Sequence, residues 1–153
     1  MAALNTPDVV VTDLDGTLCD DTHRKEWALK GNWDEYHSRL RLDPVIFPVA
    51  RILFGMRQLG YKIVAATGRP ERYRTATVEH LALNNCGGFI DEILMRRDDD
   101  RSPTPAAKLS MLMNWGTPQE ALKRVLFILD DNERVVTAYR QAGFKVLQVG
   151  DGL

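Results

Sequence analysis

Cysteine is scarce in this sequence: the 153 residues include only Cys19 and Cys86. Two cysteines are too few for a disulfide framework, and reduced thiols are typical of the cytoplasm. Residues 1–7 lack a basic segment followed by an apolar one, and no apolar run approaches the length needed to cross a bilayer. We therefore expect a cytoplasmic protein that is neither secreted nor embedded in a membrane.

An excess of charge of one sign is also missing, because 20 lysines and arginines stand against 21 aspartates and glutamates. The formal net charge of -1 gives no general attraction to nucleic acid, so such binding needs a local basic surface. The candidates for that surface are Arg24, Lys25, Arg39, Arg41, Arg69, Arg72, Arg74, Arg96, Arg97 and Arg101. The Gly-x-x-x-x-Gly-Lys-Ser/Thr loop that holds ATP phosphates is absent as well, which argues against a kinase activity.

Short apolar runs rich in β-branched residues alternate with helical patterns along the chain. This alternation predicts a parallel, doubly wound α/β sheet, and 153 residues suffice to bury a substantial core as one domain. Strands are expected at residues 9–12, 62–66, 90–94, 125–129 and 145–149. Helices are expected at residues 48–59, 72–84, 105–115 and 132–142.

Residues 19–47 interrupt this alternation, since they are too many for an ordinary strand-to-helix connection. They are rich in polar and aromatic residues, including Trp27, Trp33, Tyr36 and His37. We expect a small helical cap, with the aromatic side chains packing it onto the core. Stacking of one aromatic side chain on a terminal base is the alternative.

Two carboxylates follow the first expected strand in the run Asp13-Leu14-Asp15-Gly16-Thr17. Open α/β sheets bind ligands at the carboxyl ends of their strands, and Gly16 allows a sharp turn there. A carboxylate can attack phosphorus, and a second one two residues on can protonate the leaving oxygen and then activate water. This predicts Asp13 as nucleophile and Asp15 as acid/base, against the alternative of a turn that only ends a strand.

A second carboxylate pair, Asp130 and Asp131, follows the expected strand at residues 125–129. Magnesium prefers oxygen ligands and often uses one or two carboxylates plus a substrate phosphate. We predict a Mg²⁺ site with Asp13 and Asp131 as direct ligands, the main-chain carbonyl of Asp15 as a further one, and Asp130 ligating weakly or orienting a water. The alternative is that one of the pair caps the following helix.

Phosphate-binding groups are expected at two further places. Thr67 offers a hydroxyl and Gly68 an approachable amide after the expected strand at residues 62–66, and Arg69 could hold the substrate. Lys108 begins an apolar-periodic segment and could neutralise both the attacking carboxylate and the aspartyl-phosphate. This predicts Thr67 and Lys108 as catalytic residues and Thr67, Gly68 and Arg69 as substrate-binding ones.

The ordered motifs resemble those of the haloacid dehalogenase (HAD) superfamily of phosphohydrolases. The chain is most similar to the 3'-phosphatase domain of phage-type polynucleotide kinase-phosphatases. That likeness is carried by His23-Arg24, Trp33, Tyr36-His37, Asp43-Pro44, Thr67-Gly68-Arg69-Pro70, Leu94-Met95-Arg96, Asp100-Arg101 and Asp130-Asp131-Asn132. The resemblance implies an HAD-like Rossmannoid three-layer αβα fold: one domain over residues 1–153, with a mainly parallel five-stranded sheet and a small helical cap insertion at 19–47. It also implies that Arg24 helps to bind phosphate.

The resulting hypothesis is a Mg²⁺-dependent phosphomonoesterase that acts through an aspartyl-phosphate and removes 3'-phosphate from DNA or RNA ends. Two departures from the family pattern concern the substrate: no acidic residue stands shortly before Lys108, and Asn132 replaces a usual arginine. A nucleotidase or another small-molecule HAD phosphatase is the first alternative. A non-catalytic phosphate-binding or interaction module is the second, although such a module needs neither a nucleophile nor an acid/base.

Overall fold

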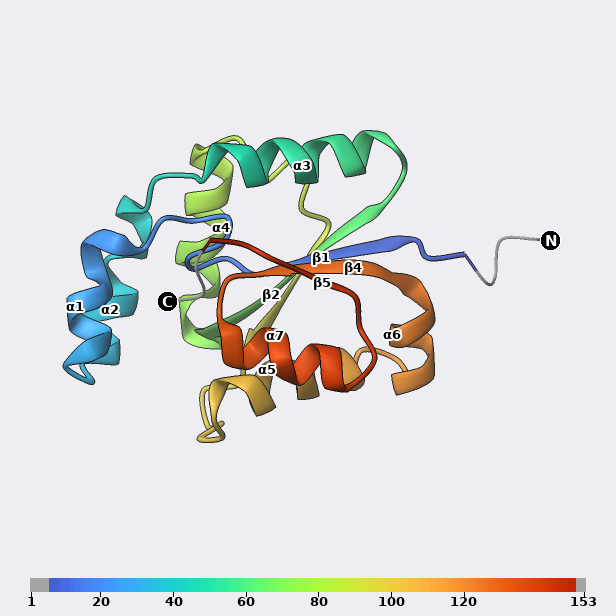
Figure 1. Cartoon of the computed structure of the whole chain (residues 1–153). Coiled ribbons are helices and arrows are strands. Elements are labelled where there is room, and N and C mark those ends of the chain that lie inside the picture. Colours follow the sequence, from blue (N-terminus) through green and yellow to red (C-terminus); the bar gives the residue numbers. More distant parts are fainter. Residues whose placement is uncertain (1–5, 151–153) are drawn as a thin grey trace.

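The computed structural model describes residues 6–150, so the ends of the expected domain, residues 1–5 and 151–153, lie outside the described part. Its centre is a parallel five-stranded sheet in the order β3-β2-β1-β4-β5 (Figure 1). The strands are β1 (Val9–Thr12), β2 (Lys62–Pro70), β3 (Glu92–Arg96), β4 (Val125–Asp130) and β5 (Val146–Gln148). The predicted parallel α/β sheet is confirmed.

Helices cover both faces of this sheet and make three layers (Figure 1). One face carries α3 (Phe47–Gln58) and α4 (Arg74–Leu83), and the other carries α5 (Thr104–Met113), α6 (Pro118–Arg124) and α7 (Glu133–Gln141). Side chains of a strand alternate between the faces, so Val9 and Val11 join the core under α5, α6 and α7, whereas Val10 joins the core under α3 and α4. All three valines are fully buried, which explains why β1 is apolar throughout.

Most element boundaries lie within two residues of the sequence prediction, but β2 is longer and one α-helix of the sheet layers was not predicted. β3 begins at Glu92 rather than at residue 90, and β2 continues to Pro70 with a register shift after Thr67. Helix α6 was not predicted, although its start has a full capping box in which Thr117 and Glu120 exchange hydrogen bonds. Such a box is visible in a sequence as Thr-x-x-Glu, but seven helical residues are too few to show an apolar period.

The inserted segment at residues 19–47 contains short helices, in line with the predicted helical character. They are η2 (Thr22–Arg24), α1 (Lys25–Leu29), α2 (Trp33–Ser38) and η3 (Leu40–Leu42). Outside this segment, the short helix η4 (Glu71–Tyr73) precedes α4. α1 and α2 lie beyond the carboxyl ends of the strands (Figure 1). A role of this segment as a cap over substrate stays a prediction. Within residues 6–150, no helix is both long and apolar enough to cross a membrane.

Candidate active site

The end of β1 places Asp13 in a buried position between two neighbouring strands. Its backbone N–H donates to the carbonyl of Leu129 in β4, at 2.8 Å. The residue as a whole is only 6% exposed. The ammonium of Lys108, on α5, lies 2.8 Å from Asp13 Oδ1, and the Thr17 hydroxyl donates to Asp13 Oδ2 at 3.3 Å. The carboxylate is thus held by a cation and a hydroxyl at the carboxyl edge of the sheet.

The second carboxylate pair converges on the same point. Oxygens of Asp13, Asp130 and Asp131 all lie within 4.8 Å of one another. Lys108 also contacts Asp130, and Thr17 donates to Asp131 Oδ1 at 3.2 Å. Asn132, rather than either aspartate, caps α7, because its Oδ1 accepts from the amides of Arg134 and Val135. The alternative that one of the pair serves as the helix cap is therefore wrong.

The protonation behaviour of this cluster follows from its burial. Burial raises the pKa of Asp13 well above its usual value, and the neighbouring carboxylates add to this rise although Lys108 opposes it. Burial also raises the pKa of Asp131. Burial opposes the charge on Lys108, but Asp13 and Asp130 outweigh it and raise the pKa of that ammonium. Three carboxylates around a single ammonium leave excess negative charge, and a hard divalent cation would relieve that charge.

Gly16 gives Asp131 the space to reach this cluster. Its φ of +82° lies in the left-handed region, and a Cβ at this position would stand 2.2 Å from Asp131 Oδ2. Any other residue would strain the turn and push that carboxylate away. The glycine that the sequence assigned to a sharp turn therefore also makes room for a carboxylate 115 positions further along the chain.

Asp15 is held by two buried guanidinium groups. Arg24 Nη2 donates to Asp15 Oδ1 at 2.5 Å, and Arg69 Nη2 donates to the same oxygen at 2.7 Å. Burial disfavours the charge on Asp15, but Arg69 and Arg24 outweigh it and hold the pKa of this carboxyl well below its usual value. Asp15 is therefore ionised at neutral pH.

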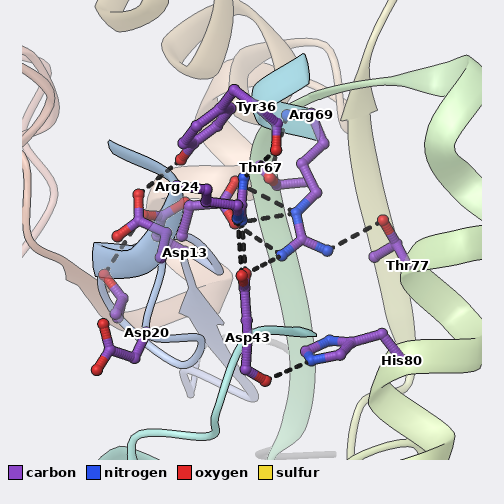
Figure 2. A network of polar contacts seen from close by, with 12 residues as sticks. Asp13, Asp20, Arg24, Tyr36, Asp43, Thr67, Arg69, Thr77 and His80 are labelled. Atoms are coloured by element: carbon purple, nitrogen blue, oxygen red, sulfur yellow. Dashed lines mark hydrogen bonds and ion pairs between the residues drawn. The ribbon is translucent and has the colours of Figure 1, made fainter. Parts of the chain in front are cut away.

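A further carboxylate, Asp43, connects the two arginines (Figure 2). Arg24 binds it in a bidentate manner, with Nε to Oδ1 at 2.7 Å and Nη2 to Oδ2 at 2.5 Å, and Arg69 Nη2 lies 3.5 Å from Oδ2. Arg69 also donates to the Thr77 hydroxyl at 3.1 Å, and the His80 ring donates to the Asp43 carbonyl at 2.8 Å. In the sequence, Asp43 contributed only to the family resemblance. No local sequence pattern predicts its contact with Arg24.

A pocket of about 440 Å³ opens over these groups. Among the predicted site residues, Asp13, Asp15, Gly68, Lys108 and Asp131 line it. Four others do not: Thr67, Asp130, Arg24 and Arg69. The Thr67 hydroxyl accepts from the Arg69 amide at 3.2 Å and is fully buried, while both guanidinium groups face carboxylates. That these three side chains contact phosphate stays a prediction.

Comparisons with known proteins find matches over almost the whole chain. The family model described as the polynucleotide kinase PNKP phosphatase domain matches residues 7–153. A chain in the solved Pnkp1/Rnl/Hen1 RNA repair complex is 30% identical, with a TM-score of 0.79 over 95% of this chain and 44% of that one. A chain in another structure of the Pnkp1/Rnl/Hen1 complex is 29% identical, with a TM-score of 0.78 over 94% and 46%.

More distant structures show the fold. The haloacid dehalogenase-like hydrolase SP0104 from Streptococcus pneumoniae is 14% identical, with a TM-score of 0.68 over 94% of this chain and 85% of that one. No curated protein sequence is significantly similar to the chain. The chain spans less than half the length of the two Pnkp1/Rnl/Hen1 chains that it matches.

Proposed function

Because the chain belongs to the family of polynucleotide kinase PNKP phosphatase domains, within the HAD superfamily, we propose that it removes 3'-phosphate from polynucleotide ends. The reaction would be Mg²⁺-dependent and pass through an aspartyl-phosphate on Asp13. One observation carries this proposal: a buried carboxylate that ends the central strand stands beside a lysine and within a cluster of three carboxylates. The phosphatase activity belongs to the family, while the metal, the intermediate and the 3'-end are our proposal.

Asp13 is the group best placed to attack phosphorus. In the first step its oxygen forms a bond to phosphorus while the bond from phosphorus to the 3'-oxygen of the substrate breaks. Lys108 lies beside that carboxylate and would offset the charge that gathers on the phosphoryl oxygens. Gly68 lines the same pocket and is placed to bring a backbone amide to those oxygens.

Asp15 fits the second step better than the first. Arg24 and Arg69 keep it ionised, which suits a base that takes a proton from the water attacking the phosphorus of the aspartyl-phosphate. Asp15 would also give its proton to the leaving 3'-oxygen in the first step, as predicted, using the proton that it takes from water in the second step of the preceding cycle. That role requires the carboxyl to hold the proton against both cations. We assign Arg24 and Arg69 to positioning Asp15, in addition to the predicted contact with phosphate.

The donor set fits Mg²⁺. Oxygens of Asp13, Asp131 and Asp130 converge, and their unbalanced charge favours a hard divalent cation over a softer metal. When bound, such an ion would reduce the repulsion between the Asp13 carboxylate and an anionic phosphate. The main-chain carbonyl of Asp15 as a further ligand remains part of the proposal.

A nucleic-acid end is the substrate class that we favour. One of the similar chains belongs to the Pnkp1/Rnl/Hen1 RNA repair complex, and the pocket is lined by six cationic side chains. These are Lys25, Arg72, Arg96, Arg97, Arg101 and Lys108. Contacts from a few of them could hold the phosphates of a strand end although the whole chain carries little net charge.

Phosphate release from matched substrates tests the proposal. The substrates are a 3'-phosphorylated oligonucleotide, in DNA and RNA form, the same strand with a 5'-phosphate, and free mononucleotides, each with Mg²⁺ and with a chelator. We expect release to be fastest from the 3'-phosphorylated oligonucleotides, slower from nucleoside 3'-phosphates and absent from 5'-ends, in each case only with Mg²⁺, and none from Asp13→Asn. Asp15→Asn should lose about a hundredfold or more in kcat.

The matched control is Asp20→Asn, since Asp20 follows the same motif but binds the Thr22 amide and does not line the pocket. It should turn over at nearly the wild-type rate. Equal activity on mononucleotides or on 5'-ends would contradict the proposed substrate. Full activity of Asp13→Asn would contradict the proposed nucleophile.

A further inference from the structure

The wall of the pocket carries a tryptophan that the proposed chemistry does not use. Trp33 begins α2, lines the pocket and is 54% exposed. One side of the indole is covered by Tyr36, whose ring packs edge to face against it with the ring centroids 5.6 Å apart. A tryptophan that served only to hold α2 in place would be expected to be more completely buried.

Trp33 is also the exposed end of a row of rings. It stacks on His37, with ring centroids 6.3 Å apart and an angle of 30° between the planes, and His37 lies against Tyr73 at 5.1 Å and 35°. Burial lowers the pKa of His37 to about 4, so the row is uncharged at neutral pH. His37 and Tyr73 are less exposed than Trp33, so the row holds the indole from behind. A flat aromatic ligand would extend such a row by one member.

One of the cationic side chains of the pocket, Arg101, comes from the loop between β3 and α5. Three arginines of the lining, Arg72, Arg96 and Arg97, have carboxylates within 4.0 Å. Within residues 6–150, Arg101 has no carboxylate at that distance, and its guanidinium donates only to the Asp98 carbonyl at 3.3 Å. Arg101 is therefore an exposed cation in the pocket wall whose charge no carboxylate of the described chain neutralises.

We propose that Trp33 stacks on the base of the 3'-terminal nucleotide and that Arg101 binds the phosphodiester on its 5' side. This inference rests on the proposed function, which places the 3'-phosphate at Asp13. The group attached to that phosphate is then a sugar with a base, and a pocket of about 440 Å³ has room for it. Every base has an aromatic face, so stacking would hold strand ends of any sequence.

The stacking contact is tested with two small substrates that share the 3'-phosphate, a nucleoside 3'-phosphate and a base-free deoxyribose 3-phosphate. We compare the ratio of kcat/KM on the first to kcat/KM on the second. Trp33→Ala is expected to lower this ratio about tenfold or more, in line with the energy of base stacking on an aromatic side chain. Trp33→Leu retains apolar packing against Tyr36 and should lower the ratio similarly, whereas Trp33→Phe should restore most of it.

The matched control is Trp27→Ala. Trp27 lies in the same inserted segment, is covered by Lys30 and Arg39, and does not line the pocket. The ratio for this variant should equal that of the wild type. A ratio unchanged in Trp33→Leu, or lowered equally in Trp27→Ala, would overturn the stacking contact, and circular dichroism would verify that each variant is folded.

The phosphodiester contact is tested by comparing a 3'-phosphorylated dinucleotide with the nucleoside 3'-phosphate. Arg101→Ala should reduce kcat/KM on the dinucleotide relative to the mononucleotide, and it should reduce the slope of log kcat/KM against log salt by roughly 0.7 for the dinucleotide. Arg51→Ala, in an exposed position on α3 outside the pocket, is the matched control. An unaltered salt slope in Arg101→Ala would overturn this contact.

Failure of the proposed subsite and failure of the proposed function give different results. If the wild type acts on 3'-ends but the Trp33 and Arg101 variants keep its ratios, the subsite is wrong while the proposed function stands. If the wild type itself hydrolyses the base-free ester as well as the nucleotides, the proposed substrate and the subsite are both wrong.

Discussion

Arg24 and Asp43, both in the inserted segment at residues 19–47, form a bidentate ion pair in which both side chains are fully buried. Arg24 lies at the end of η2, Asp43 directly follows η3, and the same guanidinium reaches Asp15. A bidentate pair fixes the plane of the guanidinium as well as its distance. The position of Asp15 therefore depends on the correct folding of the segment at residues 19–47.

Asp43→Asn should strongly destabilise the fold. The amide cannot neutralise Arg24, so Arg24 and Arg69 would then have only the carboxylate of Asp15 between them. Breaking a buried ion pair costs about 3–5 kcal/mol. Urea unfolding measures this loss. Asp34→Asn is the control, because Asp34 pairs with Arg72 on the surface and an exposed pair contributes about 1 kcal/mol or less. Similar midpoints for the two variants would show that the buried pair has no special role.

Gly16→Ala should damage both the fold and the proposed metal site, whereas Gly60→Ala should affect only the fold. Both glycines have positive φ, so each alanine costs about 1–2 kcal/mol of backbone strain. Only at Gly16 does the new Cβ collide with Asp131, since nothing lies within 4 Å of a Cβ at Gly60. We expect a loss in kcat/KM of about a hundredfold for Gly16→Ala, from misplacement of that carboxylate. Magnesium titration of the activity would show a higher requirement for this variant alone, and an equal requirement would refute the steric explanation.

Lys108→Met should make the stability of the protein depend more strongly on metal. The side chain is almost completely buried between Asp13 and Asp130, so its loss leaves close carboxylates without a cation and costs about 3–5 kcal/mol in the presence of a chelator. A ligand that binds only the folded state raises its stability, and Mg²⁺ should therefore raise the melting temperature of the variant by more than that of the wild type. Thermal unfolding with and without Mg²⁺ measures both shifts. Equal shifts would mean that Lys108 and the metal do not compensate for the same charge.

Mild acid should destabilise the protein through His37. Its pKa falls from the usual value of about 6.5 to about 4 on folding, because burial disfavours the charged ring. Between these two values the unfolded chain binds a proton that the folded protein does not, so stability is retained above pH 6.5 and lost as the pH falls. From pH 7.5 to pH 5 this group alone removes about 2 kcal/mol from the free energy of unfolding.

The variant His37→Gln isolates this effect, since glutamine does not titrate. Urea unfolding at the two pH values, with a chelator present, should show a pH dependence about 2 kcal/mol smaller in the variant than in the wild type. If the two proteins lose stability in parallel, the acid sensitivity arises elsewhere.

The fold was largely predictable because its signals are local. Runs of β-branched residues mark β1, β2 and β4, and the apolar period of α7 is visible in the sequence. The parallel sheet follows from the alternation of strands and helices. Weaker elements were placed less well: β3 is partly exposed, so its pattern does not mark its start, and α6 is too short to show a period.

The candidate site was predictable where its residues follow strands. Asp13, Thr67 and Asp130 end β1, β2 and β4 or lie near their ends, and the strand order β3-β2-β1-β4-β5 makes these three strands neighbours. Among the residues that reach the site from helices and loops, Lys108 was predicted to lie beside Asp13, but the contacts of the others were not predictable. Asp43, Thr77 and His80 lie in no motif of the sequence that points to Arg24 or Arg69.

The amino-acid sequence alone determined the alternating α/β architecture, the carboxylates at the strand ends and the family to which they belong, because all of these depend on spacing along the chain. Beyond the predicted approach of Lys108 to Asp13, the tertiary structure decided which of the many acidic and basic side chains became partners: Arg24 with Asp43, Arg69 with Asp15, and Lys108 with Asp130. Coulombic attraction between two charges has no sequence period. Its strength depends on distance and burial, and both are established only when distant segments pack together.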